Sequence, residues 1–387
     1  MGDTRLNFDL VIVGGGPAGL AAALAASKES SNVMIVEKKG TFGGPVTCGE
    51  FVPSEVEVKR LLPQASGLDE FYKFVTSITV MNRTRLIRLY TPSMSGYEFK
   101  FDGIVLNKPR FHAELAKEAE RRGVTTRAST NVTRLEERDH GVEIFASFQG
   151  VPRTVPTRIV IGADGFPSII ARNAELKTEY AATDSALCFN ALMENVDSDM
   201  DTVEMYVGNK LAPGGYAWII PKGNGVANVG LGMRLSRIDR SHVFHEYVRR
   251  FLEGPEMKSR LSEARTISKS FKIVPVGGLV KEIFTSRILL AGDAAGAVIP
   301  INGSGIPTAL VSGSIAGICA SRSLIDIYSV RNYPFLLKRQ LFMPIRKGLK
   351  YRRIADLAMK YDLAFNILVR LMGSSMVERT LRNEGFL

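Results

Sequence analysis

The sequence predicts an α/β fold, because three short glycine-rich fragments each follow a run of apolar residues. The fragments are residues 14–19, 162–165 and 292–296, and the apolar runs before them are residues 10–13, 159–161 and 288–290. Such runs are typical of strands in a parallel sheet that is buried on both faces. Ligands of these sheets bind at the carboxyl ends of the strands. We therefore expect three strand ends to meet at one crevice of a Rossmann-like sheet.

The first fragment has the spacing of a dinucleotide-binding turn. Gly14 permits the tight turn, Gly16 lets the backbone approach a pyrophosphate, and Gly19 lets the following helix pack on the strand. The helix, expected over residues 17–27, points its N-terminus at the phosphates. Glu37 ends the next strand, a little beyond the offset of about 20 residues at which an acid accepts ribose hydroxyls. A dinucleotide with a free 2′-OH is predicted.

The other two fragments extend this site toward a second head group. Asp293 follows its strand where a carboxylate can hold a ribityl hydroxyl, and the glycines of residues 302–306 offer backbone amides to a flavin ring. We expect Asp164 and Gly165 behind the pyrophosphate turn, where Asp164 fits a helix cap as well as a ligand. The cofactor predicted for three converging strand ends is FAD. No second Gly-x-Gly-x-x-Gly follows a strand, so the electron donor, NAD(P)H or ferredoxin, stays open.

Composition sets the class of protein. The chain has 387 residues, of which 45% are hydrophobic, enough for one large core or two interleaved domains. A net charge of +11 favours an anionic partner: nucleic acid, an acidic membrane surface or a phosphorylated small molecule. We expect no nucleic acid, because no nucleic-acid module is recognisable. Three scattered cysteines make neither a disulfide framework nor a zinc site. With no apolar run of about 18 residues, a cytoplasmic protein is expected.

Two further fragments carry a family resemblance. Residues 45–50, Pro-Val-Thr-Cys-Gly-Glu, and residues 213–221, Pro-Gly-Gly-Tyr-Ala-Trp-Ile-Ile-Pro, join the three glycine fragments, Pro300 and Gly305. The whole pattern resembles the hydroxylase-like flavoproteins, and within them the geranylgeranyl reductases, most of all the archaeal digeranylgeranylglycerophospholipid reductases. The second fragment is similar to that family's Pro-x-x-Tyr-x-Trp-x-Phe-Pro box, with Ile220 in place of Phe. The resemblance covers roughly residues 8–320.

The resemblance implies an activity and a set of contacts. The activity is FAD-dependent saturation of C=C bonds in geranylgeranyl chains, those of an archaeal-type glycerophospholipid, in membrane lipid biosynthesis. The implied FAD contacts are Ala18, Glu37, Cys48, Gly49, Phe51, Arg110, Val132, Asp293, Gly305 and Ile306. Phe51 stands where the family commonly has a small residue.

The order of the predicted elements suggests a discontinuous cofactor domain. After the opening strand, helix and strand, β-type segments dominate residues 74–101, and a helix is expected over residues 109–122. Alternating β-type sequence returns between residues 184 and 274, broken by a helix near residues 242–252. We expect an FAD-binding domain of residues 1–75, 105–180 and 285–330, an inserted antiparallel-sheet substrate domain of residues 76–104 and 181–284, and basic C-terminal helices over residues 331–387.

Several side chains have a functional and a plain structural interpretation. The family places Cys48 beside the flavin, so it is the candidate catalytic thiol, although a free cysteine is often only a small buried group. Tyr216 and Trp218 lie two apart on a strand and share a face, so they either contact the lipid or pack in the sheet. Cys188 and Cys319 are expected in the core. The histidines, His112, His140, His242 and His245, lack metal spacing and are expected at the surface.

The C-terminal tail and the alternatives complete the predictions. Residues 337–387 combine lysines and arginines with apolar residues at helical spacing, which fits either a solvated amphipathic helix or a contact with an anionic bilayer. One alternative function is a flavin-dependent monooxygenase or halogenase, because residues 216–221 are one aromatic away from the halogenases' Trp-x-Trp-x-Ile-Pro. Another is a non-catalytic protein that binds flavin and lipid.

Overall fold

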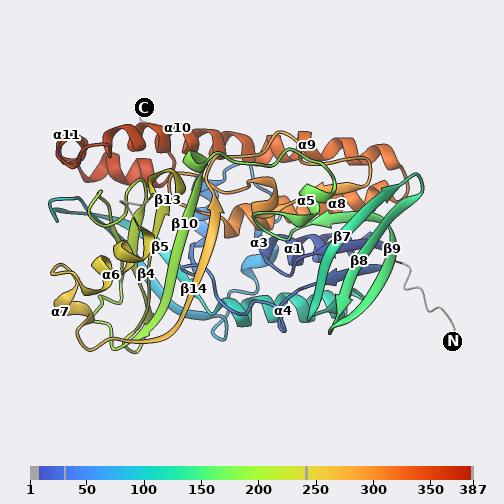
Figure 1. Ribbon diagram of the computed structural model, residues 1–387, viewed down its shortest axis with the longest axis horizontal. Coiled ribbons are helices and arrows are strands. Elements are labelled where there is room, and N and C mark those ends of the chain that lie inside the picture. Colours follow the sequence, from blue (N-terminus) through green and yellow to red (C-terminus); the bar gives the residue numbers. More distant parts are fainter. Residues whose placement is uncertain (1–7, 30–31, 240–242, 385–387) are drawn as a thin grey trace.

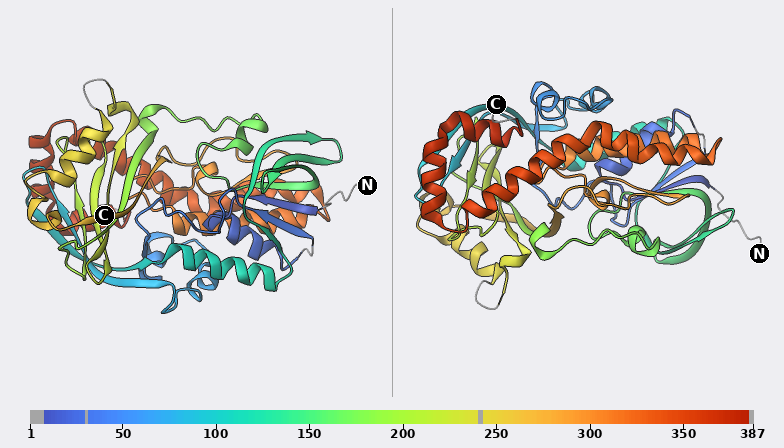
Figure 2. Two further views of the ribbon diagram at one scale, coloured as in Figure 1. Left: turned by 60° about the horizontal axis from the view of Figure 1, so that its bottom comes forward. Right: turned by 90° about the horizontal axis from the view of Figure 1, so that it is seen from above.

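The computed structural model describes residues 8–29, 32–239 and 243–384. Two sheets lie side by side along the long axis of the molecule, and helices from the end of the chain run along one side of both (Figures 1 and 2). The first sheet, on the right in Figure 1, contains the glycine-rich fragments, and the second sheet lies on the left.

The first sheet is parallel where the predicted cofactor site lies. Its strands, in spatial order, are β6 (Thr125–Arg127), β2 (Val33–Val36), β1 (Phe8–Val13), β9 (Val151–Gly162), β8 (Gly141–Phe148) and β7 (Thr130–Arg138), with β15 (Ile288–Leu290) also paired with β9. In register, Val13 and Leu290 both lie beside Gly162, in parallel pairs on the two sides of β9. The predicted convergence of three strand ends is therefore confirmed.

Helices cover this sheet and bury its apolar strands. They are α1 (Pro17–Ala26), α2 (Glu55–Leu61), α3 (Leu68–Tyr72), α4 (Lys108–Arg121), α5 (Ile169–Asn173) and α8 (Ile306–Ser323). Helix α1 is apolar on all sides, which is typical of a helix that is buried on every face, and α8 packs closely against it. Gly313 of α8 permits this approach, since a Cβ there would lie 2.0 Å from the carbonyl oxygen of Ala18.

The two faces of the second sheet pack in different hydrophobic cores. Its strand order is β14 (Arg265–Pro275), β10 (Ser185–Glu194), β13 (Val226–Arg234), β12 (Tyr216–Gly223), β11 (Thr202–Tyr206), β4 (Val80–Tyr90), β5 (Gly96–Leu106) and β3 (Phe51–Pro53). Alternate residues of β12 divide between the faces. Ala217 and Ile219 join a core with Phe251 of α6 (Phe244–Glu253), while Trp218 and Ile220 join a core with residues from the end of the chain.

The chain ends in a series of helices that links the two sheets. They are η4 (Ile327–Arg331), α9 (Asn332–Leu337), a π-helical turn (Lys338–Phe342), α10 (Met343–Ala358) and α11 (Asp362–Leu381). Smaller elements are α7 (Lys258–Leu261), η1 (Ala182–Asp184), η2 (Leu235–Arg237) and η3 (Gly292–Ala295). Helix α11 is broken at Gly373, where φ is 66° and ψ is 174°. No helix in the described part of the chain is long and apolar enough to cross a membrane.

Two details differ from the sequence expectations. The β-type region near residues 74–101 forms two long paired strands, β4 and β5, rather than several short ones. Strand β3, in a segment predicted for the cofactor domain, pairs with β5 in the second sheet. The division into domains stays a prediction. The helix expected near residues 242–252 is α6, and residue 242 lies outside the described residues.

Candidate active site

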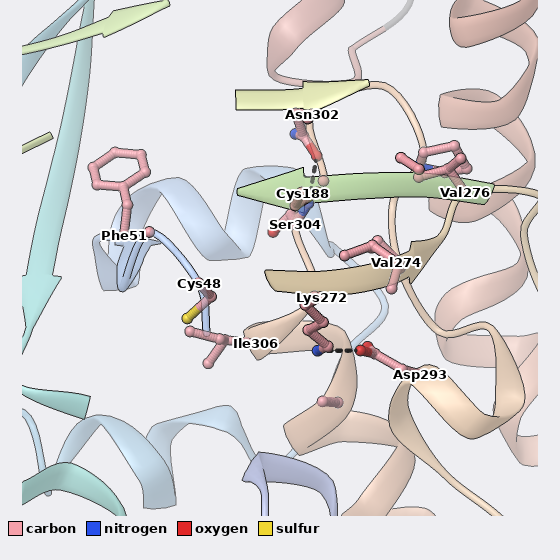
Figure 3. A pocket seen from close by; sticks show the side chains of 18 of the residues that line it. Cys48, Phe51, Cys188, Lys272, Val274, Val276, Asp293, Asn302, Ser304 and Ile306 are labelled. Atoms are coloured by element: carbon pink, nitrogen blue, oxygen red, sulfur yellow. Dashed lines mark hydrogen bonds and ion pairs between the residues drawn. The ribbon is translucent and has the colours of Figure 1, made fainter. Parts of the chain in front are cut away.

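A cavity of about 860 Å³ connects the two sheets. At one end it is lined by the glycine-rich turn after β1, and at the other by the second sheet and by α10 and α11. Figure 3 shows part of this cavity from close by. Because one space spans both ends, a cofactor held at the first sheet can meet an apolar ligand held at the second.

The turn after β1 has the geometry of a dinucleotide site. Gly14 has a φ of +110°, and a Cβ there would lie 2.3 Å from the carbonyl oxygen of Ala163, so glycine is required. A Cβ at Gly16 would meet no described atom within 4 Å, which leaves the backbone open to a ligand. Gly16 begins α1 without any side-chain cap among the described residues, so the first N–H groups of the helix can bind an anion.

Backbone hydrogen bonds hold the Glu37 side chain in place. Its Oε2 accepts a hydrogen bond from the N–H of Gly15 at 2.8 Å, and its Oε1 accepts one from the N–H of Lys39 at 2.9 Å. The side chain is buried and lines the cavity. A carboxylate with two oxygens held by backbone donors still has free lone pairs for ribose hydroxyls. The residues at this end fit the adenosine half of FAD.

Lys272 and Asp293 both line the cavity and form an ion pair. The Nζ of Lys272, on β14, donates to Oδ2 of Asp293 at 2.6 Å (Figure 3). The Asp293 carboxylate raises the pKa of Lys272, so this amine stays charged. The sequence prediction named Asp293 but missed Lys272, because no motif surrounds a single lysine in an alternating strand.

Strand β12, which carries Tyr216 and Trp218 and is called the aromatic strand below, is linked by hydrogen bonds to both loops that are predicted to touch the flavin, to one directly and to the other through Asn228 of β13. Trp218 donates from Nε1 to Oδ1 of Asn228 at 2.8 Å, and Asn228 donates from Nδ2 to the carbonyl oxygen of Cys48 at 3.0 Å. The hydroxyl of Tyr216 donates to the carbonyl oxygen of Asn302 at 2.9 Å. Sequence reasoning missed Asn228, although an asparagine within the apolar run of β13 is a usable signal.

A buried ion pair holds the segment that follows Cys48. Glu50 has a φ of 60° and is almost fully buried, and its carboxylate is paired with the Nζ of Lys222. Its Oε1 also accepts from the N–H of Lys108 at 3.0 Å, and Lys222 donates to the carbonyl oxygen of Leu106 at 3.1 Å. Both charges are thereby hydrogen-bonded, which is the condition for burying them at low cost.

Most of the predicted site residues lie at the cavity. Those that line it are Gly14, Gly16, Ala18, Glu37, Cys48, Gly49, Phe51, Val132, Asp164, Tyr216, Trp218, Asp293, Gly305 and Ile306. Gly19 lies behind the turn, where a Cβ would be 1.8 Å from the carbonyl oxygen of Gly14, consistent with close packing of helix on strand. Arg110 is exposed and is not among the lining residues, so its contact with FAD stays a prediction.

The carboxylate of Asp164 caps a helix. It accepts from the hydroxyl of Ser168 at 2.7 Å and from the N–H groups of Ile169 and Ile170 at 2.7 and 3.2 Å. Burial raises the pKa of this carboxyl, while these hydrogen bonds act in the opposite direction. These hydrogen bonds cap the start of α5, and because Asp164 also lines the cavity, its contact with FAD stays a prediction.

The expectation that His112 lies at the surface was wrong, whereas Cys188 packs against the core around Trp218 as expected but also lines the cavity. Cys188 lines the cavity beside Lys272, its partner in the β10–β14 register, and burial raises the pKa of its thiol to about 11. His112 also lines the cavity and is buried, with no hydrogen-bond partner for either ring nitrogen among the described residues. Burial lowers the pKa of His112 well below its usual value, so the ring is neutral.

The other histidines and cysteine behave as expected where they can be seen. His140 and His245 are exposed, Cys319 is buried in α8, and His242 lies outside the described residues. Within the described residues, no group of three or more histidines, cysteines or carboxylates is placed to hold a metal ion.

Two family models match this chain. The geranylgeranyl reductase catalytic domain matches residues 184–274, and the FAD binding domain matches residues 9–50. These segments contain the aromatic strand and the first glycine fragment with Glu37 and Cys48.

Several known proteins are similar over most of the chain. The digeranylgeranylglycerophospholipid reductase of Methanocaldococcus jannaschii is 32% identical over 95% of this chain and 91% of its own length. Digeranylgeranylglycerophospholipid reductase 2 of Methanopyrus kandleri is 35% identical over 82% of this chain and 78% of its own length.

Solved structures share the fold. A geranylgeranyl bacteriochlorophyll reductase-like protein from Thermoplasma acidophilum superimposes with a TM-score of 0.85 at 27% identity, covering 97% of this chain and 95% of its own. The myxobacterial chondrochloren halogenase superimposes with a TM-score of 0.71 at 17% identity, covering 98% and 94%, and shows the fold alone. The predicted α/β flavoprotein fold is confirmed. The chain belongs to the digeranylgeranylglycerophospholipid reductase family of FAD-binding proteins.

Proposed function

We propose that this protein is an FAD-dependent reductase that saturates the C=C bonds of geranylgeranyl chains, those of an archaeal-type glycerophospholipid, in membrane lipid biosynthesis. The observation that supports this function best is the continuity of the cavity. It begins at the dinucleotide turn and continues into an apolar space lined by Leu89, Phe101, Met205, Phe365 and Val369. A polyprenyl chain offers almost no polar handles, so an elongated apolar cavity is the site that suits it.

The residues of the first sheet bind and orient the cofactor in this proposal. The amides at the start of α1 hold the pyrophosphate, Glu37 holds the ribose of the adenosine, and Asp293 holds the ribityl chain beside Lys272. Lys272 pairs with Asp293 and balances its charge. When bound and reduced, FAD supplies the hydride equivalent for alkene reduction.

The residues of the second sheet position the alkene. Trp218 is buried, packs closely against Gly230, and is held by Asn228 to the same loop that contains Cys48. Tyr216 ties the strand to the glycine-rich loop through Asn302. We propose that these two rings form the wall that holds the alkene at the flavin, and that their hydrogen bonds set the distance between wall and cofactor.

Cys48 stays the candidate catalytic residue. Its loop lines the cavity, and alkene reduction requires a proton at one carbon as well as a hydride at the other. Replacing Cys48 by alanine and by serine distinguishes a contact from a chemical role: a contact tolerates both changes with intact flavin, whereas a proton-donating role requires a hydroxyl or thiol.

The partners proposed for the enzyme are a polyprenyl lipid, an electron donor that is NAD(P)H or ferredoxin, and the membrane surface that contains the lipid. The membrane contact would be peripheral and made by the basic C-terminal helices. No nucleic acid is proposed.

One anaerobic experiment tests the function. The purified protein is expected to be yellow and to retain FAD. After reduction with dithionite, it is mixed with a lipid that carries geranylgeranyl chains, and the flavin absorbance is expected to return as double bonds are saturated. A lipid with saturated phytanyl chains is the matched control and leaves the flavin reduced. Equal reoxidation by both lipids, or by neither, contradicts the proposal.

The same reaction, repeated in air with an oxygen electrode, separates the alternatives. A monooxygenase or halogenase consumes oxygen in step with its substrate and leaves the polyprenyl lipid unsaturated. A non-catalytic flavin and lipid binder takes up the lipid without any flavin reoxidation.

A further inference from the structure

Exposed residues of α10 and α11 line the cavity. Ile354 of α10 and Met376 of α11 both line the cavity, and their side chains are 44% and 37% exposed. Met372, just before the break at Gly373, also lines the cavity. Flexible methionine side chains adapt to ligands of irregular shape. The exposed, cavity-lining residues of the two helices mark the place where an opening for an apolar chain is expected, and we call this place the mouth.

Apolar side chains surround the mouth on the outer surface. On α10, Leu357 is 75% exposed and follows Ile354 by three residues, so the two lie on one stripe of the helix. On α11, Leu363, Ile367 and Leu371 recur every four residues and are 72%, 52% and 81% exposed. Helices normally turn such stripes inward. Contiguous exposed apolar stripes mark an interaction surface.

The charges beside these stripes are positive. Residues 338–373 contain nine lysines and arginines and two acids. Both acids point at polar groups of the protein: Asp356 accepts from Arg234 at 3.0 Å, and Asp362 accepts from the N–H of Asn209 at 2.9 Å. Lys350 and Arg353, in contrast, are exposed on α10. Cations next to exposed apolar residues are the combination that binds anionic bilayers.

We propose that α10 and α11 form a docking surface for an anionic lipid bilayer, and that the polyprenyl chain enters the cavity from the bilayer through the mouth. The proposal rests on the proposed function, because the membrane is chosen as occupant for the lipid that it contains. The apolar stripes insert to the level of the acyl chains, which brings the mouth to the depth where those chains lie. The cations contact the headgroups.

The break in α11 fits this arrangement. Gly373 lies between Met372 and Met376 and has a left-handed φ of 66°, so the helix changes direction at the mouth. Phe365 and Val369 before the break, and Val377 after it, are buried in the same core as Trp218. The inner face of α11 thus forms the wall of the cavity while its outer face carries the exposed leucines.

Vesicle binding tests the docking surface. The double variant Leu357→Asn/Leu371→Asn changes two exposed leucines that do not line the cavity. Its binding to vesicles of phosphatidylglycerol and phosphatidylcholine, measured by co-sedimentation, is expected to weaken about tenfold for each leucine. Ile325→Asn is the matched control, because Ile325 is 89% exposed in the loop after α8 and lies outside the docking surface. Its binding is expected to equal that of the wild type.

Charge is tested separately. Lys350→Glu/Arg353→Glu is expected to weaken binding to vesicles with phosphatidylglycerol far more than binding to pure phosphatidylcholine, and added salt is expected to reduce the difference. Wild-type binding to anionic vesicles that neither double variant weakens overturns the proposal. So does an equal loss in Ile325→Asn, or a wild-type protein that stays in the supernatant with both kinds of vesicle.

Turnover distinguishes this proposal from the proposed function. With geranylgeranyl lipid dispersed in detergent, the leucine double variant is expected to match the wild type, whereas with the same lipid in vesicles it is expected to lose activity in step with binding. A wild type that binds vesicles through the leucines but saturates no lipid in either form supports docking and contradicts the reductase function. A leucine double variant that matches the wild type on vesicle lipid overturns entry through the mouth.

Discussion

Replacing Asn228 with alanine tests the link between the aromatic strand and the Cys48 loop. Asn228 is fully buried and has one partner on each side: it accepts from Trp218 at 2.8 Å and donates to the carbonyl oxygen of Cys48 at 3.0 Å. The change to alanine leaves both partners without their hydrogen bond. It removes no group that lines the cavity.

The structure sets the size of the effect. A buried donor or acceptor that loses its partner costs about 1–3 kcal/mol, so two such groups cost about 2–6 kcal/mol of unfolding free energy. We expect the lower half of this range, because Trp218 and Cys48 both line the cavity, where water can replace the lost amide. A shift of the ring or loop by about 1 Å is expected to slow lipid saturation on the order of a hundredfold.

The assay combines urea unfolding, flavin content and anaerobic lipid saturation on the same preparations. Asn190→Ala is the control for stability, because Asn190 is also buried but its Oδ1 has no hydrogen-bond partner among the described residues. Trp218→Phe removes the same hydrogen bond from the other side, so the double variant with Asn228→Ala is expected to be less destabilised than the sum of the two. Wild-type stability and turnover in Asn228→Ala refute the reasoning.

Three other changes are expected to act on separate parts of the molecule. Glu37→Ala should weaken FAD binding by about 1–3 kcal/mol, measured by flavin fluorescence titration, because ribose hydroxyls lose their acceptor; unchanged affinity disproves that role. Burial holds the pKa of His112 well below its usual 6.5, so the unfolded chain takes up a proton that the folded protein does not. Stability should therefore fall as pH drops below about 6.5, by up to about 1.4 kcal/mol per pH unit, and His112→Phe should flatten this slope in urea unfolding; an identical slope counts against a neutral buried ring. Arg382→Met should cost about 3–5 kcal/mol of unfolding free energy, because Arg382 pairs with Glu57 at 2.7 Å and both are buried. The control is the exposed ion pair of Arg322 with Glu29, whose loss should lower the unfolding free energy by about 1 kcal/mol or less. Equal losses at the two sites would contradict a strong contribution of the buried pair.

The parts of the fold that the sequence predicts are those with local patterns. The turn from Gly14 to Gly19 and the acid at Glu37 depend on contacts within one strand, turn and helix, so their spacing alone predicts them. The convergence of β1, β9 and β15 follows from the rule that parallel strands end at one edge of a sheet. The helical tail follows from its periodicity.

The parts that the sequence does not predict depend on pairing between distant strands. Lys272 reaches Asp293 only because β14 pairs with β10 over the cofactor end of the cavity. Cys188 is expected in the core from its apolar neighbours, but its strand faces the cavity on one side. His112 lies on a helix whose polar residues suggest exposure, yet its own face is buried. In each case the burial of one side chain is decided by elements far away in sequence.

The lipid product tests the central claim most directly. The protein is expressed in a host that makes glycerophospholipids with geranylgeranyl chains, and the lipids are analysed by mass spectrometry beside those of a host that expresses Trp218→Ala. The account predicts a gain of two hydrogens for each saturated double bond with the wild type and a sharp loss of that gain with the variant, while FAD stays bound. Unchanged lipids in a host that contains the folded, FAD-loaded wild type, or a variant that saturates as fully as the wild type, would contradict it.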